Sequence, residues 1–257
     1  MKRIFEWIGG FALIAFSFYL TDRVSMLVAN KTDLMKEIKA VSSVYEIKPI
    51  NAVINIKDNT IIPGKYGKSV NTEESYLNMH DFGSFNENYL IYDYNKPKMS
   101  LEDNKKYYIT KGNSSFRNIN LVLEPNTKTE KYLKDLSVKF DLISNTKTEL
   151  NINGVEYING ENEESNFKKL DSQIKDVNIC IKNYSNLEMC KKKKYYIIDP
   201  ILKLKKHNII DVKNSLEPGS IILITKETKL EDLQLLLNEI KYKDLTIVHT
   251  SELISEK

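Results

Sequence analysis

Histidine and cysteine are scarce in this sequence, and several common motifs are missing. The chain holds three His and two Cys among 257 residues. No His-x-x-x-His or Glu-x-x-His spacing occurs, so the histidines predict no metal site. No Gly-rich phosphate loop, internal repeat or Gly-x-Ser-x-Gly elbow is present either. These absences argue against nucleotide-binding loops, repeat architectures and serine hydrolases of the elbow type.

A large net charge is also missing. Lys and Arg number 38 against 35 Asp and Glu, which gives a formal net charge of +3. A nucleic-acid-binding surface needs clustered basic residues, so nucleic acid is not an expected partner. The lysines of residues 191–194 are interpreted as the solvated end of a helix, with binding of an anionic cell-wall polymer as the alternative.

The N-terminus carries the strongest local pattern. Lys2 and Arg3 precede an apolar run at residues 7–20 that no charge interrupts. This pattern predicts a transmembrane helix over residues 1–21 with its N-terminus in the cytoplasm. A cleaved signal peptide is the alternative, but the bulky residues 18–20 offer no small-x-small cleavage site. Both interpretations place the rest of the chain outside the cytoplasm, and residues 22–43 are expected to continue as a helical stalk.

The two cysteines, Cys180 and Cys190, are expected in a strand and in the helix that follows it. In an exported chain they could form a disulfide, but sequence alone does not fix their geometry. Two unpaired, partly buried thiols are the favoured interpretation.

The sequence pattern of the remaining chain predicts two different kinds of structure, before and after residue 112. Residues 44–112 predict a small α+β module, with a hairpin at 52–64, a helix at 72–79 and strands at 89–92 and 107–110. After residue 112 strands alternate with helices, and short connections favour parallel strands in a barrel or an open wound sheet. The expected strands are 118–124, 139–143, 177–181, 195–198, 220–224 and 245–248, and the expected helices are 128–136, 167–175, 186–193, 212–216, 230–240 and 251–254.

Four segments, in the same order along the chain, resemble the NodB-type polysaccharide deacetylases. They are residues 119–126 (INLVLEPN), 132–144 (YLKDLSVKFDLIS), 217–224 (EPGSIILI) and 245–253 (LTIVHTSEL). They are similar to the first strand with its TFDDG motif, the second helix and strand, the KPGSIILLH segment and the closing VTLSEL segment of that family. The resemblance implies an irregular, incomplete (β/α) barrel over residues 113–257. The sequence resembles more closely a divergent, anchored set of such proteins from Gram-positive bacteria.

The same resemblance shows that the catalytic motifs are missing. Family members hold a divalent metal with one Asp and two His, and use a second Asp as base and a late His as acid. Glu124 stands at the base position, Pro125 at that of the metal Asp, and Thr225 at that of the acid His. No histidine lies between residues 143 and 180. We therefore expect neither a metal nor another cofactor.

The three histidines and one carboxylate remain to be interpreted. His80 and His207 are expected on exposed loops, and His249 at the edge of the core. Glu124 is the single candidate catalytic residue, because it follows a strand at the end where barrel chemistry gathers.

The leading hypothesis is a membrane-anchored, extracytoplasmic, catalytically degenerate deacetylase-like protein that binds cell-wall glycan or an envelope protein. The alternative is a divergent carbohydrate deacetylase or hydrolase, with a site rebuilt from Glu124, Asp141, Asp199 and Glu227. A purely structural membrane protein is the third hypothesis.

Overall fold

The computed structural model describes residues 15–17, 19, 23–150, 154–174 and 178–257. The chain divides into two compact units, one formed by Met1–Pro49 and Tyr66–Asn95 and the other by Ile50–Lys65 and Lys96–Lys257. The expected module at residues 44–112 is thus shared between the two units. The reason is that the hairpin and the strand near residue 108 pair with the large sheet of the second unit.

The first unit is small and largely helical. It contains α2 (Asp33–Ser42), α3 (Thr72–Met79) and two 3-10 turns (His80–Phe82 and Glu87–Tyr89), together with β3 (Gly67–Val70) and β4 (Tyr92–Asn95), which pair antiparallel. The side chains of Thr32 and Asn71 cap α2 and α3 by accepting backbone N–H groups. Met35, Ile38, Tyr76 and Met79 form its core. Strand β3 was not predicted, and β4 begins three residues later than expected because Tyr89 ends a 3-10 turn.

The predicted membrane anchor falls mostly outside the described residues, since residues 1–14, 18 and 20–22 are not among them. Over the described ranges, no helix is both long enough and apolar enough to cross a membrane. Residues 23–29 are helical and a turn at 30–32 separates them from α2. The expected stalk therefore contains two helical segments rather than one.

The second unit is built on one large sheet. Its strands are β1 (Val53–Asn55), β2 (Thr60–Ile62), β5 (Tyr108–Ile109), β6 (Asn118–Leu123), β7 (Phe140–Ser144), β8 (Val155–Asn159), β9 (Ile179–Ile181), β10 (Tyr196–Ile198), β11 (Leu202–Leu204), β12 (Ile221–Ile224) and β13 (Thr246–Ile247). The order is β1-β2-β5-β10-β9-β8-β7-β6-β12-β11, with β13 also paired to β6. β1 and β2 form the expected antiparallel hairpin, and the other paired strands are parallel, as predicted. Strands β8 and β11 were not predicted.

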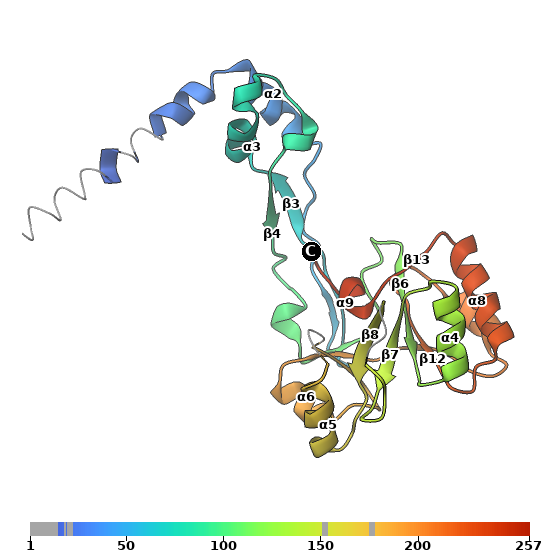
Figure 1. Cartoon of the computed structure of the whole chain (residues 1–257). Helices are drawn as coiled ribbons and strands as arrows, with labels where there is room; N and C mark the ends of the chain where they lie inside the picture. Colours follow the sequence, from blue (N-terminus) through green and yellow to red (C-terminus); the bar gives the residue numbers. More distant parts are fainter. Residues whose placement is uncertain (1–14, 18, 20–22, 151–153, 175–177) are drawn as a thin grey trace, which may run out of the picture. The chain divides into compact units, whose positions relative to one another are not determined.

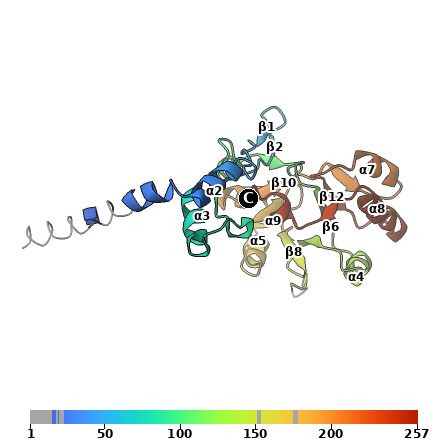
Figure 2. The ribbon, with the colours of Figure 1, turned by 90° about the horizontal axis from the view of Figure 1, so that it is seen from above.

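Helices cover the outer face of this sheet. They are α4 (Thr127–Asp135), α5 (Glu164–Asp171), α6 (Leu187–Lys192), α7 (Ile209–Ser215) and α8 (Leu230–Tyr242). The last helix is α9 (Thr250–Leu253), and Glu102–Asn104 forms a 3-10 turn. Because side chains alternate along a strand, Leu121 and Leu123 of β6 pack in a cluster with α4, α7 and α8, whereas Val122 packs in a second cluster with Leu253 of α9. Figure 1 shows α4 and α8 beside β6 and β12, and Figure 2 shows α7 next to α8. The curled sheet therefore has an inner face, partly covered by α9.

The cysteines form a disulfide between Cys180 and Cys190, and both side chains are fully buried. The expectation of two unpaired thiols was wrong. Its physical reason is that α6 turns back directly after β9 and packs on it, which brings the two Cα atoms to 6.3 Å, within the range that a disulfide spans.

The C-terminus is tied to the sheet by one buried carboxylate. Glu256 Oε1 accepts the backbone N–H of Gly64 at 2.8 Å and that of Leu101 at 2.9 Å. Replacing Glu256 by Ala leaves two donors without their acceptor, so we expect a loss of about 2 kcal/mol in the free energy of unfolding, measured by urea denaturation. Glu252→Ala is the matched control, because Glu252 makes a half-exposed ion pair with Lys139 and should cost under about 1 kcal/mol. Equal losses for the two variants would contradict this role of Glu256.

Candidate functional site

Glu124 lies directly after β6, at the carboxyl edge of the parallel strands, as expected. The hydroxyl of Tyr184 donates to its Oε1, and the backbone N–H of Lys226 donates to its Oε2 at 2.8 Å. Burial and the neighbouring Glu124 carboxylate raise the pKa of Tyr184, which keeps its hydroxyl protonated as a donor. Both carboxylate oxygens are therefore engaged, and Glu124 connects the loops that follow β6, β9 and β12.

The other positions matched to the family's catalytic motifs either lack a donor atom or form hydrogen bonds within the chain. Pro125 is exposed and has no side-chain donor atom. Asn126 caps α4 by accepting the N–H groups of Lys128 and Thr129. The hydroxyl of Thr225 donates to the carbonyl of Leu204 at 3.0 Å. These groups do not fit the metal and proton donor that deacetylation in this family requires.

The remaining carboxylates of the rebuilt-site hypothesis are not gathered around Glu124. Asp199 follows β10 and forms an ion pair with Lys182 at 2.6 Å. Glu227 is exposed in the loop after β12. Asp141 is the second residue of β7 and bonds to groups at and near the start of α9 instead. Within the described ranges, the one group of three potential metal ligands is Asp141, Glu156 and His249.

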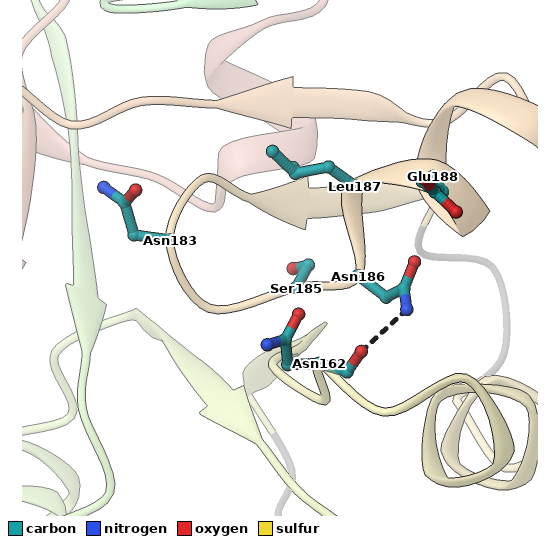
Figure 3. A pocket seen from close by; sticks show the side chains of 6 residues that line it. All are labelled: Asn162, Asn183, Ser185, Asn186, Leu187 and Glu188. Carbon is teal, nitrogen blue, oxygen red and sulfur yellow. Dashed lines mark hydrogen bonds between the residues drawn. The ribbon is translucent and has the colours of Figure 1, made fainter.

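A polar pocket opens at the same carboxyl edge, between the loops that follow β8 and β9 (Figure 3). Its volume of about 370 Å³ lies in the range of small-molecule sites. The lining residues are Asn162, Asn183, Ser185, Asn186, Leu187 and Glu188. The amide nitrogen of Asn186 donates to the backbone carbonyl of Asn162 at 2.7 Å, which joins the two loops. The lining contains carboxamides, a hydroxyl, one apolar side chain and a carboxylate but no cation, so it suits a neutral, hydroxyl-rich ligand better than an anion.

A second polar cluster lies on the inner face, towards the amino ends of the strands. Asp141 on β7 and Glu156 on β8 are register partners, and His249 immediately precedes α9. His249 Nδ1 lies 2.6 Å from Asp141 Oδ1, and one ligand atom from each of the three residues falls within 4.8 Å of the others. The Asp141 side chain is fully buried and that of His249 is 15% exposed.

Hydrogen bonds explain this cluster without a metal ion. Asp141 Oδ2 accepts the side-chain amide of Asn120 at 2.7 Å and the backbone N–H of Thr250 at 2.8 Å, and also the Thr250 hydroxyl. Glu156 accepts the backbone N–H and the hydroxyl of Ser251. The two carboxylates thus satisfy N–H groups in the first turn of α9 that the helix itself leaves unpaired. The cluster docks α9 onto β6, β7 and β8.

Sequence reasoning missed Glu156 because it did not predict β8. The signal was available, since residues 155–159 (VEYIN) carry β-branched and aromatic side chains between Gly154 and Gly160. His249 was expected at the edge of the core, and it lies there. His80 and His207 are exposed, as expected.

The stability of this cluster should depend on pH. Burial and the nearby Asp141 charge raise the pKa of Glu156 to about 7, and the bond to Asp141 raises the pKa of His249 above its ordinary 6.5. Both groups hold protons more tightly in the folded than in the unfolded chain, so stability falls as pH rises from about 4.5 through about 7 and beyond. We expect this fall to be on the order of 2 kcal/mol between pH 5 and pH 8 by urea denaturation.

Glu156→Gln supplies the control for this pH dependence. The amide cannot titrate but keeps an oxygen acceptor for Ser251. The variant should therefore show a shallower fall between pH 5 and pH 7 than the unaltered chain. Parallel pH profiles for the two proteins would assign the dependence to other groups.

Comparison by sequence finds a partial match to a known protein. No protein-family profile matches the chain. The uncharacterised protein YlxY of Bacillus subtilis (strain 168) is 40% identical over 87 residues, which are 34% of this chain and 27% of that protein. The match therefore spans about a quarter of that relative's length.

Solved structures match over much more of the chain. The crystal structure of a CE4 family pseudoenzyme from Bacillus anthracis covers 88% of this chain and 96% of its own, with a TM-score of 0.60 and 19% identity. A mutant of that pseudoenzyme, described as having restored enzymatic activity, covers 87% of this chain and 98% of its own, with a TM-score of 0.57 and 18% identity. The resemblance inferred from the four ordered segments is thereby confirmed for the fold. The chain has the curled α/β fold of the CE4, NodB-type polysaccharide deacetylases, in a divergent form.

Proposed function

We propose that this protein is a catalytically degenerate deacetylase-fold protein of the cell envelope that binds a glycan. The proposal rests on the side chains around Glu124, at the carboxyl edge of the parallel strands. Both carboxylate oxygens of Glu124 accept hydrogen bonds, one from Tyr184 and one from Lys226. Pro125 and Thr225 stand where the fold's enzymes need a metal ligand and an acid. A site with these side chains has no means of holding a hydrolytic metal ion or protonating a leaving amine.

Glycan binding is supported by the pocket between the loops after β8 and β9. The carboxamides of Asn162 and Asn183 and the carboxylate of Glu188 line it, and Leu187 adds an apolar surface. Sugars present hydroxyl groups to such hydrogen-bonding side chains and C–H groups to apolar ones. The volume of about 370 Å³ lies within the range of small-ligand sites.

An extracytoplasmic position is supported by two features. The disulfide Cys180–Cys190 is a bond that persists in oxidising compartments and is rare in the cytosol. The basic start and the apolar run at residues 7–20 have the pattern of a single membrane-spanning anchor. Cell fractionation tests this part: the full chain should sediment with membranes and resist a high-salt wash, and recovery in the soluble cytoplasmic fraction would contradict it.

Activity and metal content test the degenerate state. The full chain, purified in detergent, should contain no stoichiometric Zn, Ni or Co and release no acetate from acetylated chito-oligosaccharides. Acetate release that requires a bound metal would instead support a divergent deacetylase with a rebuilt site.

Calorimetry with N-acetylchitotetraose tests binding. We expect a Kd near the millimolar to micromolar range, as for a small polar pocket, and about tenfold weaker binding for Asn162→Ala with Asn183→Ala. Lys206→Ala is the control, because Lys206 is exposed on the loop after β11, which is not part of the pocket. Absence of binding to this probe would remove the support for a chitin-type glycan.

A further inference from the structure

The disulfide encloses the segment that carries the polar pocket. Five of the six lining residues, Asn183, Ser185, Asn186, Leu187 and Glu188, lie between Cys180 and Cys190, which are 10 positions apart. Tyr184, whose hydroxyl binds Glu124, lies in the same segment. One covalent bond therefore closes a short loop around most of the pocket.

Both ends of this loop are fixed in the protein interior. Cys180 is the middle residue of β9 and Cys190 lies in α6, and both are fully buried with Phe167 and Ile197 in a small apolar cluster. This cluster is separate from the two larger clusters on the faces of the sheet. The bond therefore fastens α6 to β9 without being part of the main core.

Apart from the bond, α6 is held by the apolar cluster that contains Met189 and by hydrogen bonds in the segment before it. It has only six residues, too few for a helix to be stable by itself. Its start is held by Asn186, which caps it through Met189 N–H and reaches Asn162 O at 2.7 Å. Asn186 is half-buried at the pocket, and Asn183 is exposed and adopts a φ of 72°, a conformation that asparagine tolerates. The side-chain hydrogen bonds of Asn186 lie at the pocket surface and compete with water, whereas the disulfide does not.

We infer that the Cys180–Cys190 disulfide holds the pocket in its ligand-binding shape, so that the affinity of the pocket depends on this bond. The inference rests on the proposed glycan-binding function for its ligand, but the rigidity of the loop can be measured without one. The bond acts by pre-organisation: a loop that is already ordered loses less conformational freedom when it binds.

Hydrogen exchange of the full chain tests directly whether the disulfide holds this segment in place, a role called the clamp below. In Cys180→Ala with Cys190→Ala, the amides at positions 186, 189 and 190 should exchange at least about tenfold faster than in the unaltered chain, because a covalent bond no longer restricts local opening of the segment. Amides of β6 and β12 should keep most of their protection. Unchanged exchange at the three loop amides would overturn the inference.

Two further variants make the result specific. Leu133→Ala removes a fully buried side chain of α4, so it destabilises the unit without touching the pocket and should leave exchange of the three loop amides near its original rate. Cys180→Val with Cys190→Ala refills part of the lost volume and replaces the first variant if that one fails to fold.

Binding of N-acetylchitotetraose separates this inference from the proposed function. If the unaltered chain binds the probe, the double cysteine variant should bind it about tenfold more weakly, and Leu133→Ala should bind it normally. If exchange accelerates but the unaltered chain binds nothing, the clamp stands and the glycan proposal fails. If the unaltered chain binds and the variant binds equally well, the clamp is overturned and the glycan proposal stands.

Discussion

Replacing Asp141 by Ala is expected to lower the free energy of unfolding of the larger unit by about 3–5 kcal/mol, because several hydrogen-bond donors around it lose their acceptor at once. Asp141 is fully buried and accepts hydrogen bonds from Asn120, Thr250 and His249. Its removal leaves these donors facing an apolar interior where water does not replace the carboxylate. Urea denaturation followed by far-ultraviolet circular dichroism measures the loss.

Two variants define how specific this effect is. Asp141→Asn keeps the volume and one oxygen acceptor, so it should lose less stability than Asp141→Ala. Asp199→Ala removes another carboxylate, one whose ion pair with Lys182 is partly exposed, and should cost about 1 kcal/mol or less. If Asp141→Ala were no more harmful than Asp199→Ala, the cluster would not be what docks α9.

Local patterning predicted the parts of the fold that local physics decides. The mostly apolar run at residues 118–124 predicted a strand, and β6 forms over residues 118–123. Asn126, just before the expected helix, caps α4 as a residue of its type should. The short connections between strands and helices predicted parallel pairing, and the pairing is parallel.

Contacts between distant parts of the chain were beyond the same reasoning. Asp141 and His249 are 108 residues apart, and only the pairing of β13 with β6 brings the start of α9 to Asp141. The short hairpin β1–β2 was predicted, but its place at the end of the large sheet depends on β5, a strand of two residues with almost no signal. The sequence predicted that Glu124 follows a strand at the carboxyl edge. It did not predict the hydrogen bond from Tyr184, because Tyr184 lies 60 residues further along the chain.

The two polar regions of the larger unit have different physical roles. The Asp141 cluster lies towards the amino ends of the strands, where barrel-like folds gather residues that stabilise rather than react. Glu124 and the polar pocket lie at the carboxyl ends, where such folds bind ligands.

Removing the disulfide should have the next largest effect on stability. For a closed loop of this length, with a sequence separation of 10, the chain-entropy relation gives about 3 kcal/mol for Cys180→Ala with Cys190→Ala. Urea denaturation of the oxidised chain and the variant measures the difference. The unaltered chain, unfolded and refolded with a phosphine reductant, should lose a comparable amount. A double variant as stable as the oxidised chain would mean that the two thiols do not pair in the folded protein, because a bond closing this loop constrains the unfolded chain in every case.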